Sequence, residues 1–195
     1  MKTNAAKNTN NSEEIRETWE RLRGNQADAL SQLFRQTSDL LFRYGSKFYS
    51  DQELVKDCIQ ELFVKLHQTQ NELPTLKNPL FYLFRVLKNI LFNAIRQRAK
   101  LLYLSPQDLP FQAEFYFEPE EKDDENLEET SALLEQLFSC LSNRQKEAIY
   151  LRYQMDMSYE EIAQLLEINY QSARNLVHRA LEKIRAEKVS IWLIL

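Results

Sequence analysis

Glycine occurs only twice in this chain of 195 residues, at Gly24 and Gly45. Strands joined by tight turns depend on glycine, because the turn residues adopt backbone conformations that other residues avoid. Long stretches rich in Leu, Glu, Gln, Lys, Arg and Ala favour helix instead. A hydrophobic content of 44% is enough for packed cores. The chain is therefore predicted to be all-α.

The helical patterns form two groups on either side of an acidic segment. Residues 105–129 contain three prolines and an acidic run at 118–129, which is typical of a linker. We expect a disordered tail over 1–12, a helical domain over 13–100, an acidic linker over 101–130 and a second helical domain over 131–195. Aromatic residues interrupt the linker, so that parts of it are expected to dock.

Apolar residues recur at helical spacing over 15–24, 29–48, 51–68 and 80–100 in the first half. Capping boxes, in which a helix-starting Ser pairs with Glu or Gln three residues on, are predicted at Ser50, Ser142 and Ser158. Residues 71–78 contain Pro74 and are predicted to be a loop. The apolar segment 189–195 is too short to span a bilayer. We expect it to fold back onto a neighbouring helix, with contact to a partner as the alternative.

Residues 158–184 predict two helices joined by a short turn, with Asn169 as the N-cap of the second. The second helix has an apolar face at Ala173, Val177 and Ala180. Its other face is rich in hydrogen-bond donors, which suits a recognition helix in a DNA major groove. An ordinary helical hairpin with polar surface residues is the alternative. The outward residues are Gln171, Arg174, Asn175, His178 and Arg179.

The helix predicted over 80–100 combines an apolar face with basic and aromatic residues. Basic side chains contact phosphates, and exposed aromatic rings stack on unpaired bases. Phe81 and Tyr82 fit the apolar stripe least well, so we expect one of them to be exposed. In the alternative interpretation the aromatic rings belong to the core and the basic side chains form a solvated face. The donors are Arg85, Lys88, Asn89, Arg96, Arg98 and Lys100.

The net charge of −4 conceals an uneven distribution. Residues 103–130 hold ten acids and one base, a net −9, which leaves +5 on the rest of the chain. Residues 77–100 hold six basic residues and no acid. Local fields rather than total charge steer DNA, so the chain remains compatible with nucleic-acid binding.

Cys58 and Cys140 lie in apolar patterns without clustered ligands, so we expect buried free thiols, no metal site and a reducing cytoplasm. The polar N-terminus is not a signal peptide. We find no phosphate-binding loop, dinucleotide fingerprint or nucleophile elbow, which argues against an enzyme. Asp57, Gln60 and Glu61 lie beside an apolar helix face, where they either dock a partner helix or face solvent.

Three segments together resemble an extracytoplasmic-function sigma factor, a small bacterial RNA polymerase specificity subunit of the sigma-70 family. KDCIQELFVKLH (56–67) and FYLFRVLKNILFNAIRQRAK (81–100) are similar to conserved region 2. Residues 141–185 are similar to region 4 almost throughout. The resemblance covers roughly residues 15–185, and its two separate motifs stand in the expected order.

The resemblance implies a site for core RNA polymerase and two sites for promoter DNA. It implies that the loop 71–80 captures an unstacked base of the −10 element, and that an anti-sigma factor clamps the domains. It implies no cofactor and no small-molecule substrate. The polymerase site would be Asp57, Gln60, Glu61 and Phe63. The −10 site would be Asn78, Phe81, Tyr82, Lys88, Asn89, Arg96 and Arg98. The −35 site would be Tyr170, Gln171, Ser172, Arg174, Asn175, His178 and Arg179.

The chain departs from the family pattern at four positions. Glu167 replaces the usual Gly in the turn of region 4, where a left-handed backbone would cost about 1 kcal/mol. Asn93 replaces an Asp, Lys88 an Arg and His67 a Trp. The main rival is a helix-turn-helix regulator that acts without polymerase, which explains 158–184 but not 56–67 or 81–100.

Overall fold

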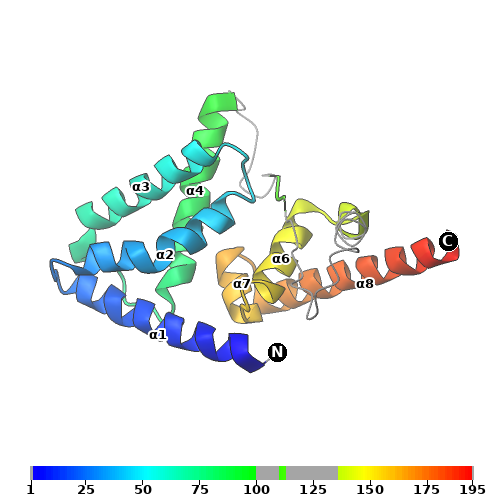
Figure 1. The fold of residues 1–195 in the computed structure, drawn as a ribbon, viewed down its shortest axis with the longest axis horizontal. Helices are drawn as coiled ribbons and strands as arrows, with labels where there is room; N and C mark the ends of the chain where they lie inside the picture. Colours follow the sequence, from blue (N-terminus) through cyan, green and yellow to red (C-terminus); the bar gives the residue numbers. More distant parts are fainter. Residues whose placement is uncertain (1, 100–109, 113–135, 195) are drawn as a thin grey trace. The chain divides into compact units, whose positions relative to one another are not determined.

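The computed structural model describes residues 2–99, 110–112 and 136–194, and every regular element within these ranges is helical. The all-α prediction is therefore confirmed. The chain divides into two compact units, residues 1–109 and 110–195 (Figure 1). Most of the predicted acidic linker, residues 101–130, lies outside the described residues.

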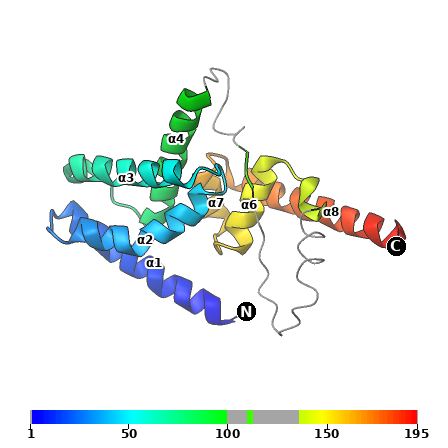
Figure 2. The ribbon, with the colours of Figure 1, turned by 45° about the horizontal axis from the view of Figure 1, so that its top comes forward.

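Unit 1 contains α1 (Lys2–Arg23), α2 (Ala29–Gly45), α3 (Gln52–Gln68), the short 3-10 helix η1 (Gln70–Glu72) and α4 (Pro79–Ala99). Helix α4 packs against the three other long helices, and α1 lies along α2 (Figures 1 and 2). Trp19 of α1, Tyr44 of α2 and Phe84 of α4 are fully buried in the core of this unit. The Tyr44 ring lies 4.7 Å from that of Phe84, so aromatic contacts join α2 to α4.

Gly45 ends α2 at a point where three helices approach closely. A Cβ atom at this position would lie 2.8 Å from Cγ1 of Val55 on α3 and 3.3 Å from Cδ1 of Leu91 on α4. Such distances are shorter than van der Waals contact, so the absence of a side chain is what lets the three helices pack.

Unit 2 contains a helical stretch at 136–139, then α6 (Asn143–Tyr153), α7 (Tyr159–Leu165) and α8 (Tyr170–Ile194). Both predicted capping boxes are present, at Ser142 with Gln145 and at Ser158 with Glu161. Phe111 is buried, with its ring 5.5 Å from that of Tyr150. This part of the predicted linker is therefore docked.

Helix α1 begins at Lys2 and so includes most of the residues expected to form the N-terminal tail. Two predictions about element ends are wrong. Helix α8 continues to Ile194 instead of folding back, since no Gly or Pro interrupts it. The N-cap of α3 is Asp51 rather than Ser50. Within the described residues no helix is long and apolar enough to cross a membrane.

Candidate nucleic-acid interface

The turn between α7 and α8 sets the direction of the candidate recognition helix. The amide of Ile168 donates to the carbonyl of Ala163 at 2.9 Å, which is the closing bond of a Schellman helix terminus. Glu167 occupies the left-handed position of this motif, with φ of 54°. Asn169 then accepts a hydrogen bond from the Ser172 amide at 2.7 Å. The predicted N-cap of α8 is confirmed, and so is the left-handed conformation at the family's glycine position.

Helix α8 presents the predicted −35 residues on one exposed face. Ala173, Val177 and Ala180 are fully buried against α6 and α7, so the residues between them point away from the core. Gln171 donates to Asn175 at 3.2 Å, and His178 lies 3.4 Å from Glu182. The exposed residues are Tyr170, Gln171, Ser172, Arg174, Asn175, His178 and Arg179.

Two further aromatic and basic residues, which the sequence interpretation missed, stand beside this face. The Arg152 guanidinium lies 5.3 Å from the centre of the Tyr159 ring, and Tyr159 meets Tyr170 edge to face at 6.2 Å. The capping box at Ser158 predicts that Tyr159 begins a helix, but it does not predict which side chains Tyr159 contacts. The stack links the end of α6 to the first residue of α8.

Two arginines of unit 2 hold the helix-turn-helix together through backbone carbonyls. Arg144 donates to the carbonyl of Leu166 at 3.0 Å, next to the turn that contains Glu167. Arg152 donates to the carbonyl of Met157 at 2.8 Å, just before the N-cap of α7. Charged donors that satisfy the ends of helices fix the angle between them.

Helix α4 divides the predicted −10 residues into exposed and buried groups. Asn89, Arg96 and Arg98 are exposed, while Asn78 and Tyr82 are partly exposed. The Tyr82 ring meets Trp19 edge to face at 5.5 Å.

Of the pair Phe81 and Tyr82, Tyr82 is the more exposed, whereas Phe81 and Lys88 are each only 9% exposed. Lys88 lies 5.2 Å from the centre of the Phe48 ring, where its long aliphatic stem packs on the core and its charge faces an aromatic ring. The aromatic residues of α4 belong largely to the core, as the alternative interpretation held.

Arg98 is exposed and also paired with a carboxylate. Its Nη1 lies 2.5 Å from Oδ2 of Asp51, the N-cap of α3. Hydrogen bonds from the Leu54 amide and from Arg98 hold the pKa of Asp51 below its ordinary value. The same contact raises the pKa of Arg98. The end of α4 is thereby joined to the start of α3.

The predicted polymerase residues of α3 lie on two sides of the helix. Asp57, Gln60 and Glu61 are exposed, and Glu61 pairs with Lys65 at 2.5 Å. Phe63 is only 7% exposed and packs edge to face on Phe34 at 5.0 Å, which removes it from the exposed surface because its ring fills the gap between α2 and α3.

The exposed side of α3 also carries apolar groups. Val64 is 54% exposed, and Phe34 on α2 is 41% exposed. A surface pocket lined by Phe34, Phe42 and Ile59 lies beside Gln60.

Burial raises the pKa of the Cys58 thiol to about 11, so this cysteine stays protonated at neutral pH. In the part of the chain that the structure describes, no cluster of His, Cys, Asp or Glu could hold a metal ion.

Comparison with known proteins agrees with this geometry. The family model for sigma-70 region 2 matches residues 33–101, and the model for sigma-70 region 4 matches residues 131–184. No curated protein sequence matches the chain.

The solved structures that share the fold include two complexes. One is CnrH in complex with the cytosolic domain of CnrY, at 18% identity and a TM-score of 0.59, covering 90% of this chain and 97% of that chain. The other is the sigma factor RpoE in complex with the anti-sigma factor NepR from Bartonella quintana, at 20% identity and a TM-score of 0.57, covering 83% and 97%. Since the two family matches together span most of the chain in the order region 2 then region 4, the chain belongs to the sigma-70 family and functions as an RNA polymerase sigma factor.

Proposed function

We propose that this sigma factor directs core RNA polymerase to promoters by reading the −35 element as duplex with unit 2 and holding the melted −10 element with unit 1. The observation that carries the −35 assignment is the exposed donor face of α8, which a capped turn and two arginine–carbonyl bonds hold in place. Amide and guanidinium side chains on one helix face match the base edges of the major groove.

For the −10 element, we propose that exposed donors of α4 contact phosphates at the upstream edge of the melted region, while the loop 71–80 takes up a base. Unstacking a base step costs a few kcal/mol, which base capture and phosphate contacts offset. The −10 residues in this proposal are Asn78, Tyr82, Asn89, Arg96 and Arg98. Phe81 and Lys88 support the helix from within.

For core polymerase, we propose the exposed side of α3, where Asp57, Gln60 and Glu61 are exposed together with apolar Val64 and where Gln60 lines the pocket beside Phe34. Polar groups around an apolar centre are usual for a protein interface. Phe63 shapes this surface from beneath. We also propose that an anti-sigma factor binds the chain, because CnrH and RpoE, which share its fold, were solved with CnrY and with an anti-sigma factor.

In this proposal the chain acts in the cytoplasm, where polymerase and promoter are found, and by binding rather than by catalysis. The test is transcription reconstituted from core polymerase, the chain and a promoter mapped from its transcripts. Single base changes in either element should each reduce initiation strongly. Specific DNA binding without any recruitment of core polymerase would instead identify the rival helix-turn-helix regulator.

A further inference from the structure

The end of α1 and the turn after it are bound to the segment that precedes α4. Nε1 of Trp19 donates to the carbonyl of Pro74 at 3.0 Å, and Nε of Arg23 donates to the carbonyl of Leu73 at 2.9 Å. Nδ2 of Asn25 donates to Oδ1 of Asn71 at 2.6 Å. Three donors at residues 19–25, at the end of α1 and in the turn after it, therefore meet acceptors at residues 71–74.

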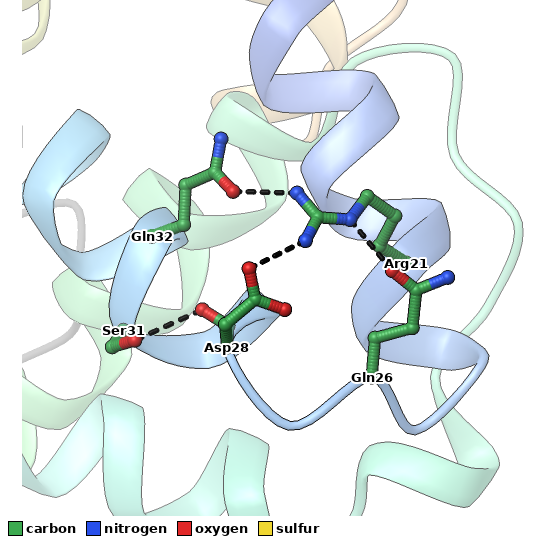
Figure 3. A network of polar contacts seen from close by, with 5 residues as sticks. All are labelled: Arg21, Gln26, Asp28, Ser31 and Gln32. Carbon is green, nitrogen blue, oxygen red and sulfur yellow. Dashed lines mark hydrogen bonds and ion pairs between the residues drawn. The ribbon is translucent and has the colours of Figure 1, made fainter.

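The donors are themselves held in place. Asn25 has φ of 55° and ends α1 in a Schellman motif, in which the amides of Asn25 and Gln26 donate to the carbonyls of Leu22 and Arg21. The adjoining turn is fixed by Arg21, whose guanidinium donates to Gln26, Asp28 and Gln32 (Figure 3). Trp19 is fully buried. The end of α1 is thus a rigid platform rather than a fraying terminus.

The loop is anchored along its first half. Leu73 is buried, and the backbone amide of Glu72 closes η1 by donating to the Thr69 carbonyl at 2.8 Å. The bonds from α1 reach Asn71, Leu73 and Pro74, and the following residues 75–78 include exposed side chains at Thr75 and Lys77. Anchoring the first half therefore fixes where 75–78 are presented.

We infer that α1 is a positioning element for −10 recognition, and that Arg23 is the positioning residue that fixes the path of the loop through Leu73. The inference rests on the proposed role of this loop in base capture. Helix α1 precedes the region 2 match, which begins at residue 33, so this role lies outside the matched segment. A loop already shaped before DNA arrives loses less entropy on binding, which raises both affinity and discrimination.

Arg16 on the same helix provides a matched control. Arg16 pairs with Glu13 three residues before it, as Arg23 pairs with Glu20. Arg23→Gln and Arg16→Gln each remove one positive charge and one such ion pair from α1. Of the two arginines, Arg23 is the one that donates to the loop.

The experiment uses the full chain in holoenzyme with core polymerase. Binding is measured to a fork-junction promoter that carries each of the four bases at the captured −10 position. We expect Arg23→Gln to reduce affinity for the preferred base about tenfold, the amount that one charge-assisted hydrogen bond supports, with little change for the other bases. Arg16→Gln should bind the fork-junction promoter like the parent chain. Both variants should bind −35 duplex with the affinity of the parent chain.

Hydrogen exchange in the free chain gives a second measurement that needs no DNA. Amides of residues 72, 73 and 75–77 should exchange faster in Arg23→Gln than in Arg16→Gln, while those of α2 and α3 stay protected. Equal exchange and equal discrimination in the two variants would overturn the inference. A salt dependence whose slope falls by about one in Arg23→Gln would overturn it too, because it would show a direct phosphate contact.

The proposed function and the inference fail differently. Changing Thr75→Ala and Lys77→Gln together should also reduce base discrimination if the loop captures the base. If this double variant discriminates like the parent, base capture by the loop is wrong, and the exchange experiment still decides whether Arg23 fixes the loop. If the double variant loses discrimination but Arg23→Gln does not, the positioning role is wrong and the proposed function stands.

Discussion

Asp51 binds Arg98 through one carboxylate oxygen and caps α3 through the other. Oδ2 accepts from Arg98, whereas Oδ1 accepts from the amides of Glu53 and Leu54 at 3.1 Å. Asn is as good an N-cap as Asp but cannot accept from Arg98 through its amide nitrogen. Asp51→Asn therefore separates the helix cap from the ion pair.

We predict that Asp51→Asn unfolds at lower urea concentration than the parent chain at pH 7, and that the difference disappears in acid. The pKa of Asp51 is lower in the folded chain than in the unfolded chain, so its stabilisation is complete above the ordinary value near 3.8. It is lost as the pH falls through the folded value. Urea midpoints from pH 7 to pH 2 measure this, with Asp39→Asn as control. A pH-independent difference would contradict the prediction.

Glu167→Gly should stabilise unit 2. The left-handed backbone at Glu167 costs about 1 kcal/mol for a residue with a Cβ and almost nothing for Gly. The expected gain in unfolding free energy is about 0.5–1 kcal/mol, since Gly also gains entropy in the unfolded chain. Glu167→Ala, which removes the same carboxylate but keeps the strain, is the control for denaturant unfolding. Equal stability of the two variants would exclude strain at this turn.

Alanine should be costly at Gly45 and tolerated at Gly24. In Gly45→Ala the new methyl collides with Val55 and Leu91, so the unfolding free energy should fall by about 1–3 kcal/mol. In Gly24→Ala the nearest atoms are carbonyl oxygens at 3.5 Å, so stability should be unchanged or rise by less than about 1 kcal/mol. Thermal or urea unfolding of both variants measures the contrast, and a similar loss in both would contradict it.

Tyr159→Ala should weaken binding to −35 duplex, because the ring that orients Tyr170 is lost. An aromatic pair contributes about 0.5–1.5 kcal/mol beyond its buried area, which sets the expected loss. Tyr159→Phe keeps the ring between Arg152 and Tyr170 and should bind like the parent. The affinities of the parent chain, Tyr159→Ala and Tyr159→Phe for −35 duplex are compared at one salt concentration. Equal binding by all three chains would show that the stack has no role in reading DNA.

Arg174→Ala should lower affinity for the −35 duplex by about 1–3 kcal/mol if Arg174 reads a base edge. A scrambled duplex should lose much less, because phosphate contacts carry no sequence information. Arg185→Ala, an exposed arginine further along α8, controls for charge alone. The same loss on specific and scrambled duplexes would rule out base reading by Arg174.

Elements with local signals were predictable from the sequence. The capping boxes at Ser142 and Ser158, the cap at Asn169 and the strained turn at Glu167 each depend on a few neighbouring residues. The scarcity of glycine and the helical spacing of apolar residues were enough for the all-α fold and for the exposed face of α8.

Features that depend on distant contacts were not predictable in the same way. Phe81 and Lys88 look available by periodicity, yet α4 is packed on three sides, which leaves only a narrow exposed strip. The bonds from Trp19 and Arg23 to the loop join residues 50 or more positions apart, and no local pattern predicts such contacts. Ser50 and Asp51 are adjacent and are both good N-cap residues, so residue type alone does not predict that Asp51 is the one that caps α3.

The fully buried residues of α1 have a practical consequence for anyone who divides this protein. The region 2 match begins at residue 33, but Ile15, Trp19 and Leu22 are at most 1% exposed and complete the core between α2 and α4. A fragment cut at the family boundary would leave this apolar surface uncovered and would aggregate. The smallest fragment of unit 1 that retains its own interior must therefore start before Ile15, some eighteen residues earlier than the match.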